Sequence, residues 1–158
     1  RVMIVDWDVL HGNETQHSFY DVPSVLFFST HQFPYYPGTG RATETGEGNG
    51  RGYTINVPLP GCQGDDEYRE IFHKVLVPAA EAFRPEFVLI SAGFDAHRDD
   101  PLASMDLTDD GYGELTSIVA DLANRFSCGR IVSCLEGGYH LRALAGSVDR
   151  HLQMLMVS

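Results

Sequence analysis

Short apolar segments and longer segments with helical spacing alternate along the chain. Four runs rich in β-branched or aromatic residues predict strands at residues 2–6, 25–29, 87–91 and 131–135, and a fifth candidate lies at residues 53–57. Most of these runs are continuously apolar rather than alternating, a pattern typical of strands that are buried on both faces. The pattern therefore predicts a parallel sheet covered by helices.

Three segments have an apolar stripe with the spacing of a helix. The first covers residues 68–83, follows two aspartates that suit a helix N-terminus, and contains Pro78, which predicts a kink. The second begins after Thr108, a candidate N-cap, and stops near Gly129. The third covers residues 141–155. Because these helices alternate with the strands, the fold class is α/β.

One segment departs from this alternation. Residues 38–52 contain six of the sixteen glycines and almost no apolar residue, so we predict a long loop there. Loops of this length in compact domains are usually functional or mobile. The sequence shows no internal repeat and no domain boundary.

Composition and charge narrow the classes of protein. A chain of 158 residues has the length of one domain. It holds 22 acidic and 11 basic residues, and the resulting net charge of −11 argues against direct binding to nucleic acid, which requires a basic face. The acidity could help to collect a cationic ligand, or it could serve only solubility.

Cysteine usage and the absence of targeting signals indicate the cellular compartment. The three cysteines lack CxxC spacing, so we predict no disulfide framework and expect small buried side chains in a reduced compartment. No run approaches the roughly 20 apolar residues of a membrane span, and no signal peptide is recognisable, so we predict no membrane association and a cytoplasmic location. The chain enters an apolar run directly after Arg1, so we expect a fragment that lacks its N-terminal portion.

Polar side chains follow directly on the predicted strands. The carboxyl ends of parallel strands share one edge of a sheet, where ligands usually bind, so we expect these side chains to converge. They are Asp6, Asp8, His11, Ser29, His31, Asp95, His97, Glu136 and Tyr139.

Two of these carboxylates suit a divalent metal. Asp8 and Asp95 on one sheet edge would form an oxygen-rich pair, with histidine as the usual nitrogen ligand. Asp6 projects to the same side as Asp8 in an extended segment, and such carboxylates repel one another unless a cation neutralises them. Taken singly, however, Asp6 could accept backbone hydrogen bonds at a strand end, and Asp95 could cap a turn.

A tyrosine follows two glycines after the last predicted strand. Gly137 and Gly138 could bring the backbone and the next side chain close to a ligand. The Tyr139 hydroxyl could then donate a hydrogen bond to an oxyanion that forms at a metal-activated carbonyl. The alternative is a glycine turn with Tyr139 packed on the sheet.

Four ordered motifs resemble the zinc-dependent histone deacetylase family. They are Val-Asp-Trp-Asp-Val-Leu-His-Gly-Asn at 5–13, Tyr-Pro-Gly-Thr-Gly at 36–40, Ser-Ala-Gly-Phe-Asp-Ala-His at 91–97 and Leu-Glu-Gly-Gly-Tyr at 135–139. The resemblance is greatest to class II and bacterial amidohydrolase members, which include acetylpolyamine hydrolases and acetoin-utilisation proteins. It implies a three-layer, arginase-like α/β fold with a mainly parallel sheet, of which residues 1–158 would be the C-terminal part.

The resemblance also implies an activity and its residues. A family member is a hydrolase that removes acetyl groups from acetyl-lysine peptides or acetylated polyamines. By this resemblance Asp8 and Asp95 would hold zinc, Tyr139 would polarise the acetyl carbonyl, and Tyr36 would form an aromatic wall of the acyl-lysine tunnel, beside Gly137 and Gly138.

A potassium site is implied as well. Asp6 and Ser29 resemble residues of a family potassium site. His31 and His97 match family positions near the site, without an assigned role.

The first motif departs from the family pattern at two positions, and a histidine pair is absent. Leu10 occupies the position of a zinc-ligand histidine and cannot bind zinc, and His11 would point to the opposite side of an extended segment. Glu14 replaces a glycine, which would disturb the turn if that glycine has a positive φ. The family's paired base histidines lie upstream of the first motif, and the seven histidines here contain no such pair.

Two readings follow. In the first, the chain is the C-terminal portion of a zinc-dependent amidohydrolase and is inactive, or nearly so, by itself, because a zinc ligand and the base are missing. In the second, it is a non-catalytic descendant that binds acylated ligands or another protein. A homo-oligomer is compatible with both.

Overall fold

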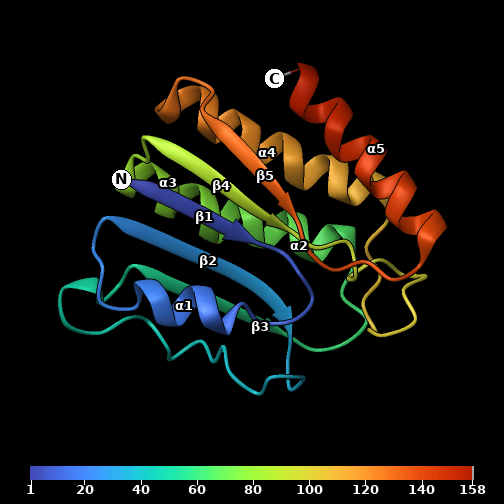
Figure 1. Cartoon of the computed structure of the whole chain (residues 1–158), viewed down its shortest axis with the longest axis horizontal. Helices are drawn as coiled ribbons and strands as arrows, with labels where there is room; N and C mark the ends of the chain where they lie inside the picture. The colour runs from blue at the N-terminus through green and yellow to red at the C-terminus, as the bar shows by residue number, and fades with distance from the viewer. Residues whose placement is uncertain (158) are drawn as a thin grey trace.

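The structure, a computed structural model, describes residues 1–157, and these contain a five-stranded parallel sheet (Figure 1). The strands lie in the order β3-β2-β1-β4-β5. All five predicted strands are confirmed, with small changes at their ends. Their bounds are β1 (Val2–Asp6), β2 (Val25–Gln32), β3 (Thr54–Leu59), β4 (Phe87–Ala92) and β5 (Ile131–Leu135).

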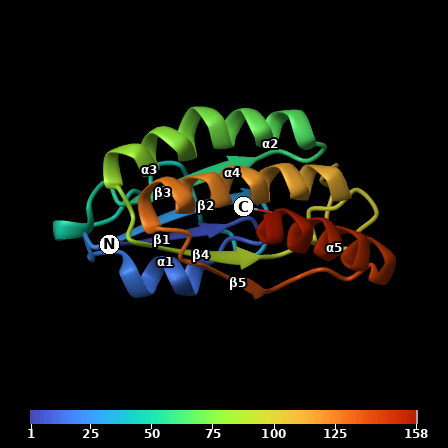
Figure 2. The same ribbon diagram turned by 90° about the horizontal axis from the view of Figure 1, so that it is seen from above.

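Helices cover the two faces of the sheet unequally. Helices α2 (Asp65–Ile71), α3 (Val77–Phe83) and α4 (Asp109–Ser127) lie on one face, and the short α1 (Asn13–Phe19) lies on the other (Figure 2). The C-terminal helix α5 (Leu141–Val157) packs along α4. A further short 3-10 turn, η1 (Gly48–Gly50), interrupts the glycine-rich loop. The α/β class is therefore confirmed.

The hydrophobic core lies mainly between the sheet and α2 to α4. Trp7, Phe72 and Tyr112 are among its fully buried large side chains. On the α1 face, only a small cluster of Ile4, Val25 and Phe27 is buried. This imbalance explains why the strands near α1 are buried on both faces while others are not.

The expectation of burial on both faces is wrong for β5 and only half right for β4. Side chains of β4 alternate between buried and partly buried, and no side chain of β5 is fully buried. Val132 and Leu135 are exposed apolar residues of β5. The reason is positional: β5 is an edge strand, and α1 does not reach across to cover its second face.

The predicted helix signals are present, with one change at Pro78. Thr108 caps α4, because its side chain accepts a hydrogen bond from the Gly111 N–H. Pro78 does not end its helix. Instead a π-helical turn, η2 (Phe72–Leu76), joins α2 to α3, and the Val77 N–H donates to the Phe72 carbonyl. The π-helical turn thus lies one turn before Pro78, where the missing proline N–H disturbs the helical hydrogen bonds.

Helix α1 was not predicted, and the cysteine prediction was partly wrong. No residue of α1 is buried, so its sequence has no apolar stripe. Glu14 lies within this helix, which removes the concern about a positive φ at that position. Cys62, Cys128 and Cys134 form no disulfide, as predicted, but all three are exposed. Two lie in turns and the third on the uncovered face of β5. No helix among residues 1–157 is long and apolar enough to cross a membrane.

Candidate functional site

The polar residues that follow the strands converge at the carboxyl edge of the sheet. Register explains part of this convergence, because Asp6 at the end of β1 pairs with Ser29 of β2 and with Ser91 of β4. From this edge the loops carry Asp8 and Asp95 toward each other. The predicted convergence of Asp8 and Asp95 is therefore observed.

Asp8 and Asp95 form the centre of the site and are held by backbone donors. One oxygen of Asp95, Oδ1, accepts a hydrogen bond of 2.8 Å from the Val9 N–H. Asp8 Oδ1 accepts from the Leu10 N–H at 2.9 Å, and Asp8 Oδ2 accepts from the Gly137 N–H at 2.8 Å. The loops after three different strands are therefore tied together by two carboxylates.

Glycine is required where these carboxylates meet. A Cβ atom on Gly137 would lie 2.3 Å from Asp95 Oδ2 and 2.7 Å from Asp8 Oδ2. A Cβ atom on Gly93 would lie 2.3 Å from Asp8 Oδ2. Both Oδ2 atoms therefore border Gly137, with no room for any larger residue.

One carboxylate oxygen at this centre has no partner. Asp95 is 1% exposed, and its Oδ2 is buried without a hydrogen bond. Burial and the adjacent Asp8 carboxylate raise the pKa of Asp95 to about 7. A buried acceptor without a donor is rare, and here it points to a cation or proton as its natural partner.

The residues present do not complete a zinc site. Two carboxylates suit zinc, but a structural or catalytic zinc ion takes at least three protein ligands. Within residues 1–157, no group of three or more His, Cys, Asp or Glu side chains is arranged to hold a metal ion. Leu10 lines the same cavity as Asp8, so an alkyl side chain stands near the carboxylates where a third ligand is needed.

His11 does not replace the missing ligand. Its Nε2 donates to Gln16 Oε1 at 2.9 Å, and its Nδ1 accepts from the Thr39 hydroxyl at 2.8 Å. Its ring centre is 4.7 Å from that of His31, and burial lowers the pKa of His11. Both ring nitrogens of His11 are thus occupied by hydrogen bonds, although the residue also lines the cavity that Asp8 lines.

A second polar cluster lies beside this centre, and its side chains hydrogen-bond mainly to one another and to the nearby backbone. His31 accepts from the Ser29 hydroxyl at Nδ1 and donates from Nε2 to the Gly40 carbonyl at 2.7 Å. Glu44 accepts from the Gln16 side chain and from the backbone N–H groups of Gly40 and Arg41. We call His11, Gln16, His31, Glu44 and Asn56 the histidine cluster. It fastens part of the glycine-rich loop onto the sheet.

Tyr139 shares a cavity with Asp8. This cavity, of about 420 Å³, is also lined by Leu10, Glu136 and Gly137. Tyr139 is 53% exposed, and burial and the carboxylates of Asp95 and Asp8 raise the pKa of its hydroxyl. Its position is set from the backbone, since Asp100 Oδ2 accepts the Tyr139 N–H at 2.9 Å.

Other predicted site residues lie outside this cavity. Tyr36 is 75% exposed in the loop after β2, and Gly138 packs between Phe94 and Leu144 behind the cavity. His97 is turned toward α4, where its Nε2 lies 3.3 Å from Asp109 Oδ1. The structure therefore gives His97 a place in the packing of the loop.

Sequence reasoning missed several residues that shape the site. Gln16, Glu44 and Asn56 belong to no motif: Gln16 of α1 contacts His11, and the folded loop and β3 bring Glu44 and Asn56 to Gln16. Asp100 was also missed, although its place five residues after Asp95, in the same loop, was a usable signal. Its two oxygens bind the backbone of Tyr139 and Leu102.

Comparison with known proteins identifies relatives over nearly the whole chain. The family profile described as "Histone deacetylase domain" matches residues 1–155. The chain is 48% identical over 148 residues to "Histone deacetylase 10, chloroplastic" of Oryza sativa subsp. japonica, covering 94% of this chain and 33% of the relative. It is 44% identical over 142 residues to "Histone deacetylase-like amidohydrolase" of Pseudomonas aeruginosa, covering 88% of this chain and 37% of the relative.

Solved structures agree with these relatives. The crystal structure of the HDA15 HD domain matches with a TM-score of 0.94 and 45% identity, covering 99% of this chain and 45% of that one. The histone deacetylase Clr3 matches with a TM-score of 0.94 and 39% identity, covering 99% of this chain and 27% of that one. The chain thus spans less than half the length of each of these four relatives.

Proposed function

Because the chain belongs to the histone deacetylase domain family, we propose that it is the C-terminal part of an amidohydrolase domain that removes acetyl groups from amines. In this proposal residues 1–158 are one portion of a single larger domain, and the chain by itself is inactive or nearly so. Membership in the family supports hydrolysis of a linear amide as the reaction class.

One observation supports this proposal most directly. Asp8 and Asp95 place two carboxylate oxygens side by side, and Tyr139 opens into the cavity that Asp8 lines. The unpartnered Asp95 Oδ2 atom is an acceptor that the fold itself leaves unsatisfied. A packing role alone does not explain a buried carboxylate with an unused oxygen.

The chain's own residues would perform part of the reaction. The Tyr139 hydroxyl would donate a hydrogen bond to the carbonyl oxygen of an acetamide as negative charge develops on it, which favours the transition state over the ground state. Gly137 would let the acyl group approach the carboxylates. Neither Leu10 nor His11 can activate water. We therefore assign the activation of water to no residue of this chain.

The acidic charge is consistent with a cationic substrate. Acetyl-lysine peptides and acetylpolyamines usually carry other amino groups, which a chain of net charge −11 would attract. We propose these two classes as substrates of the intact domain, with Tyr36, Gly137 and Gly138 near the acyl chain. Nucleic acid and membranes are not proposed as partners, a cytoplasmic location is proposed, and a homo-oligomer is compatible with the proposal.

A potassium ion beside β1 completes the proposal. Burial and the neighbouring Asp8 raise the pKa of Asp6 well above its usual range, so a cation there would stabilise the ionised carboxylate. Asp6 and Ser29 are paired across β1 and β2, which supports their joint role.

Restoring the missing ligand tests the proposal. We expect Leu10→His to bind zinc at least about tenfold more tightly than the unchanged chain, since even outer-shell partners of zinc ligands are worth 10–100-fold. Zinc content and affinity are measured by equilibrium dialysis and mass spectrometry, with Leu10→Ala as the control for altered packing. No deacetylation of a fluorogenic acetyl-lysine peptide is expected from either variant, because the chain still lacks a base.

Two outcomes would contradict this proposal. One equivalent of zinc together with turnover by the unchanged chain would show that Leu10 does not disable the site. Failure of Leu10→His to bind zinc would favour a second function, in which the cavity binds an acylated ligand or another protein without hydrolysis. The alkyl wall that Leu10 gives to the cavity is the observation in favour of that function.

A further inference from the structure

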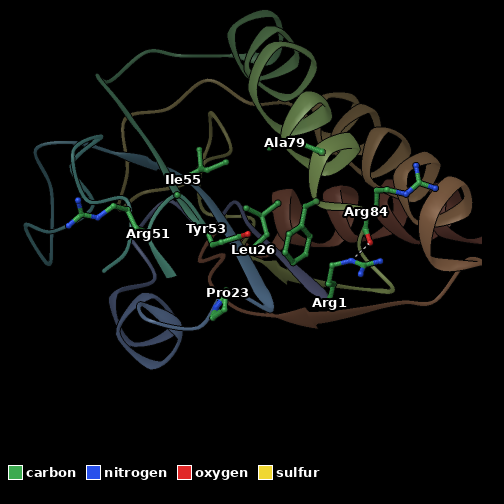
Figure 3. Close-up of a pocket in the computed structure, with 11 residues that line it drawn as sticks. Arg1, Pro23, Leu26, Arg51, Tyr53, Ile55, Ala79 and Arg84 are labelled. Carbon is green, nitrogen blue, oxygen red and sulfur yellow. Dashed lines mark hydrogen bonds between the residues drawn. The ribbon is translucent and has the colours of Figure 1, made fainter. Parts of the chain in front are cut away.

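A larger cavity lies at the opposite edge of the sheet from Asp8 and Asp95. It has a volume of about 680 Å³ and lies between the starts of β1 to β3 and the end of α3 (Figure 3). Its floor is apolar and consists of Leu26, Tyr53, Ile55 and Phe83, with the Tyr53 and Phe83 rings edge to face at 5.9 Å. The volume is within the range of pockets that bind small molecules.

The charged residues that line this cavity are all basic. Arg1, Arg51 and Arg84 stand around the floor, and no Asp or Glu lines it, although acidic residues outnumber basic ones by 22 to 11 in the chain. The charge of this cavity is therefore opposite in sign to the net charge of the chain. Such a local excess attracts anions despite the negative net charge.

These three guanidinium groups are not used in ion pairs within the described part of the chain. Arg51 has no side-chain partner there, and the Arg84 guanidinium lies 5.3 Å from the centre of the Phe126 ring. Arg1 Nε donates to the Arg84 carbonyl, while the Arg1 amino group, not its side chain, pairs with Glu86. By contrast, side-chain ion pairs to carboxylates occupy four other basic residues, namely Arg69, Lys74, Arg125 and Arg150.

We propose that this cavity binds a small amphipathic anion, with a carboxylate or phosphate group at the arginines and an aliphatic or aromatic body on the floor. The guanidinium fork matches both anionic groups and forms strong charge-assisted hydrogen bonds with them. The side chains of Arg51 and Arg84 extend away from the floor in opposite directions (Figure 3), so binding requires that both rotate inward and that the Arg84 guanidinium leave the Phe126 ring.

Calorimetric titration of the chain tests this proposal. The probes are octanoate and monooctyl phosphate, with octanol and octyltrimethylammonium as neutral and cationic controls of the same chain length. We expect saturable binding of at least one anion and none of the two controls. Binding of octanoate alone indicates a fatty-acid type of ligand, and binding of the phosphate alone indicates a phosphate headgroup.

Matched variants locate the binding. Arg51→Gln with Arg84→Gln should weaken anion binding by about tenfold, while Arg51→Lys with Arg84→Lys should retain most of it. Ala82→Trp, at the exposed mouth of the cavity, should block it, and Arg41→Gln, which removes one positive charge at the other sheet edge, should have no effect. Octanol binding as tightly as octanoate, no binding of either anion, or equal binding by the Gln pair would each overturn the proposal.

Discussion

Two polar regions share the carboxyl edge of the sheet and are built in opposite ways. In the histidine cluster, both ring nitrogens of His11 and of His31 have hydrogen-bond partners, and the Glu44 carboxylate accepts three donors. In the carboxylate centre, Asp8 and Asp95 lie side by side, and one buried oxygen of Asp95 has no partner. The first region leaves the neutral Asn56 amide oxygen without a partner, whereas the second leaves an oxygen of an ionisable carboxylate without one.

The difference shows how to separate structural polar residues from functional ones. A buried network whose members satisfy one another makes the fold specific and has no capacity left for a ligand. A buried acceptor that the fold leaves unsatisfied destabilises the protein by itself, and such groups cluster at functional sites. By this criterion His11 and His31 position the glycine-rich loop, whereas Asp8 and Asp95 have the capacity to bind a cation or proton.

The largest effect is expected from closing the space inside the histidine cluster. Gly40 has a φ of +90°, and a Cβ atom there would lie 2.4 Å from His31 Nε2 and 2.7 Å from the His11 ring. We expect Gly40→Ala to lower the free energy of unfolding by about 3 kcal/mol, from backbone strain and overpacking together. Urea denaturation measures this change.

Gly113→Ala is the matched control for this substitution. A Cβ atom on Gly113, within α4, meets its nearest neighbours at an ordinary 3.7 Å, so this change should stabilise the protein by roughly 0.5–1 kcal/mol. A loss below about 1 kcal/mol in Gly40→Ala would mean that the cluster is loose.

The two regions should respond to acid with opposite signs. Burial lowers the pKa of His31 from 6.5 to about 4. Between these two pH values His31 is protonated in the unfolded chain but neutral in the folded chain. This difference should cost about 2 kcal/mol of stability between pH 7 and pH 5. Burial and Asp8 raise the pKa of Asp95 from 3.8 to about 7, so on acidification Asp95 is protonated in the folded chain at a higher pH than in the unfolded chain. The same acidification therefore stabilises the fold through Asp95.

Two variants separate these opposing contributions. Relative to the unchanged chain, His31→Gln should lose less stability on going from pH 7 to pH 5, and Asp95→Asn should lose more. Denaturation curves at pH 7, 6 and 5 provide the comparison. Parallel pH profiles for both variants would refute the opposite signs.

The smallest effects concern two tyrosine hydroxyls. The buried Tyr112 hydroxyl accepts the Ala96 N–H at 3.1 Å, so Tyr112→Phe should cost about 1–2 kcal/mol. The Tyr139 hydroxyl has no hydrogen bond in the described part of the chain, and Tyr139→Phe should change stability by less than about 0.5 kcal/mol. Thermal unfolding of both variants decides the point, and equal losses would assign Tyr139 a structural role.

Much of the fold could be predicted because burial leaves a pattern in the sequence. The five strands and the three long helices were found from apolar spacing, and Thr108 from its capping chemistry. Helix α1 could not be found this way, because none of its residues is buried and its sequence has no stripe. The exposure of β5 could not be found either, because an apolar run does not say whether a second layer covers it.

Only part of the candidate site could be predicted from the sequence in the same way. Asp8, Asp95 and Tyr139 were found because they follow strands whose ends must meet at one edge. Glu44 could not be found, since the glycine-rich loop must fold back before Glu44 contacts Gln16, and Gln16 itself lies in the unpredicted helix α1. Long-range polar contacts of this kind have no local signal in a single sequence.

The uncovered strand β5 also sets how the chain behaves in concentrated solution. Its free edge and its exposed Val132 and Leu135 can pair with a strand of another molecule, and such edges are sites of aggregation. At low salt, the charge of −11 keeps neighbouring molecules apart, but screening at physiological ionic strength shortens this repulsion to about 8 Å. We therefore expect the colloidal stability of the chain to depend on the electrolyte, with added salt lowering the protein concentration at which it associates.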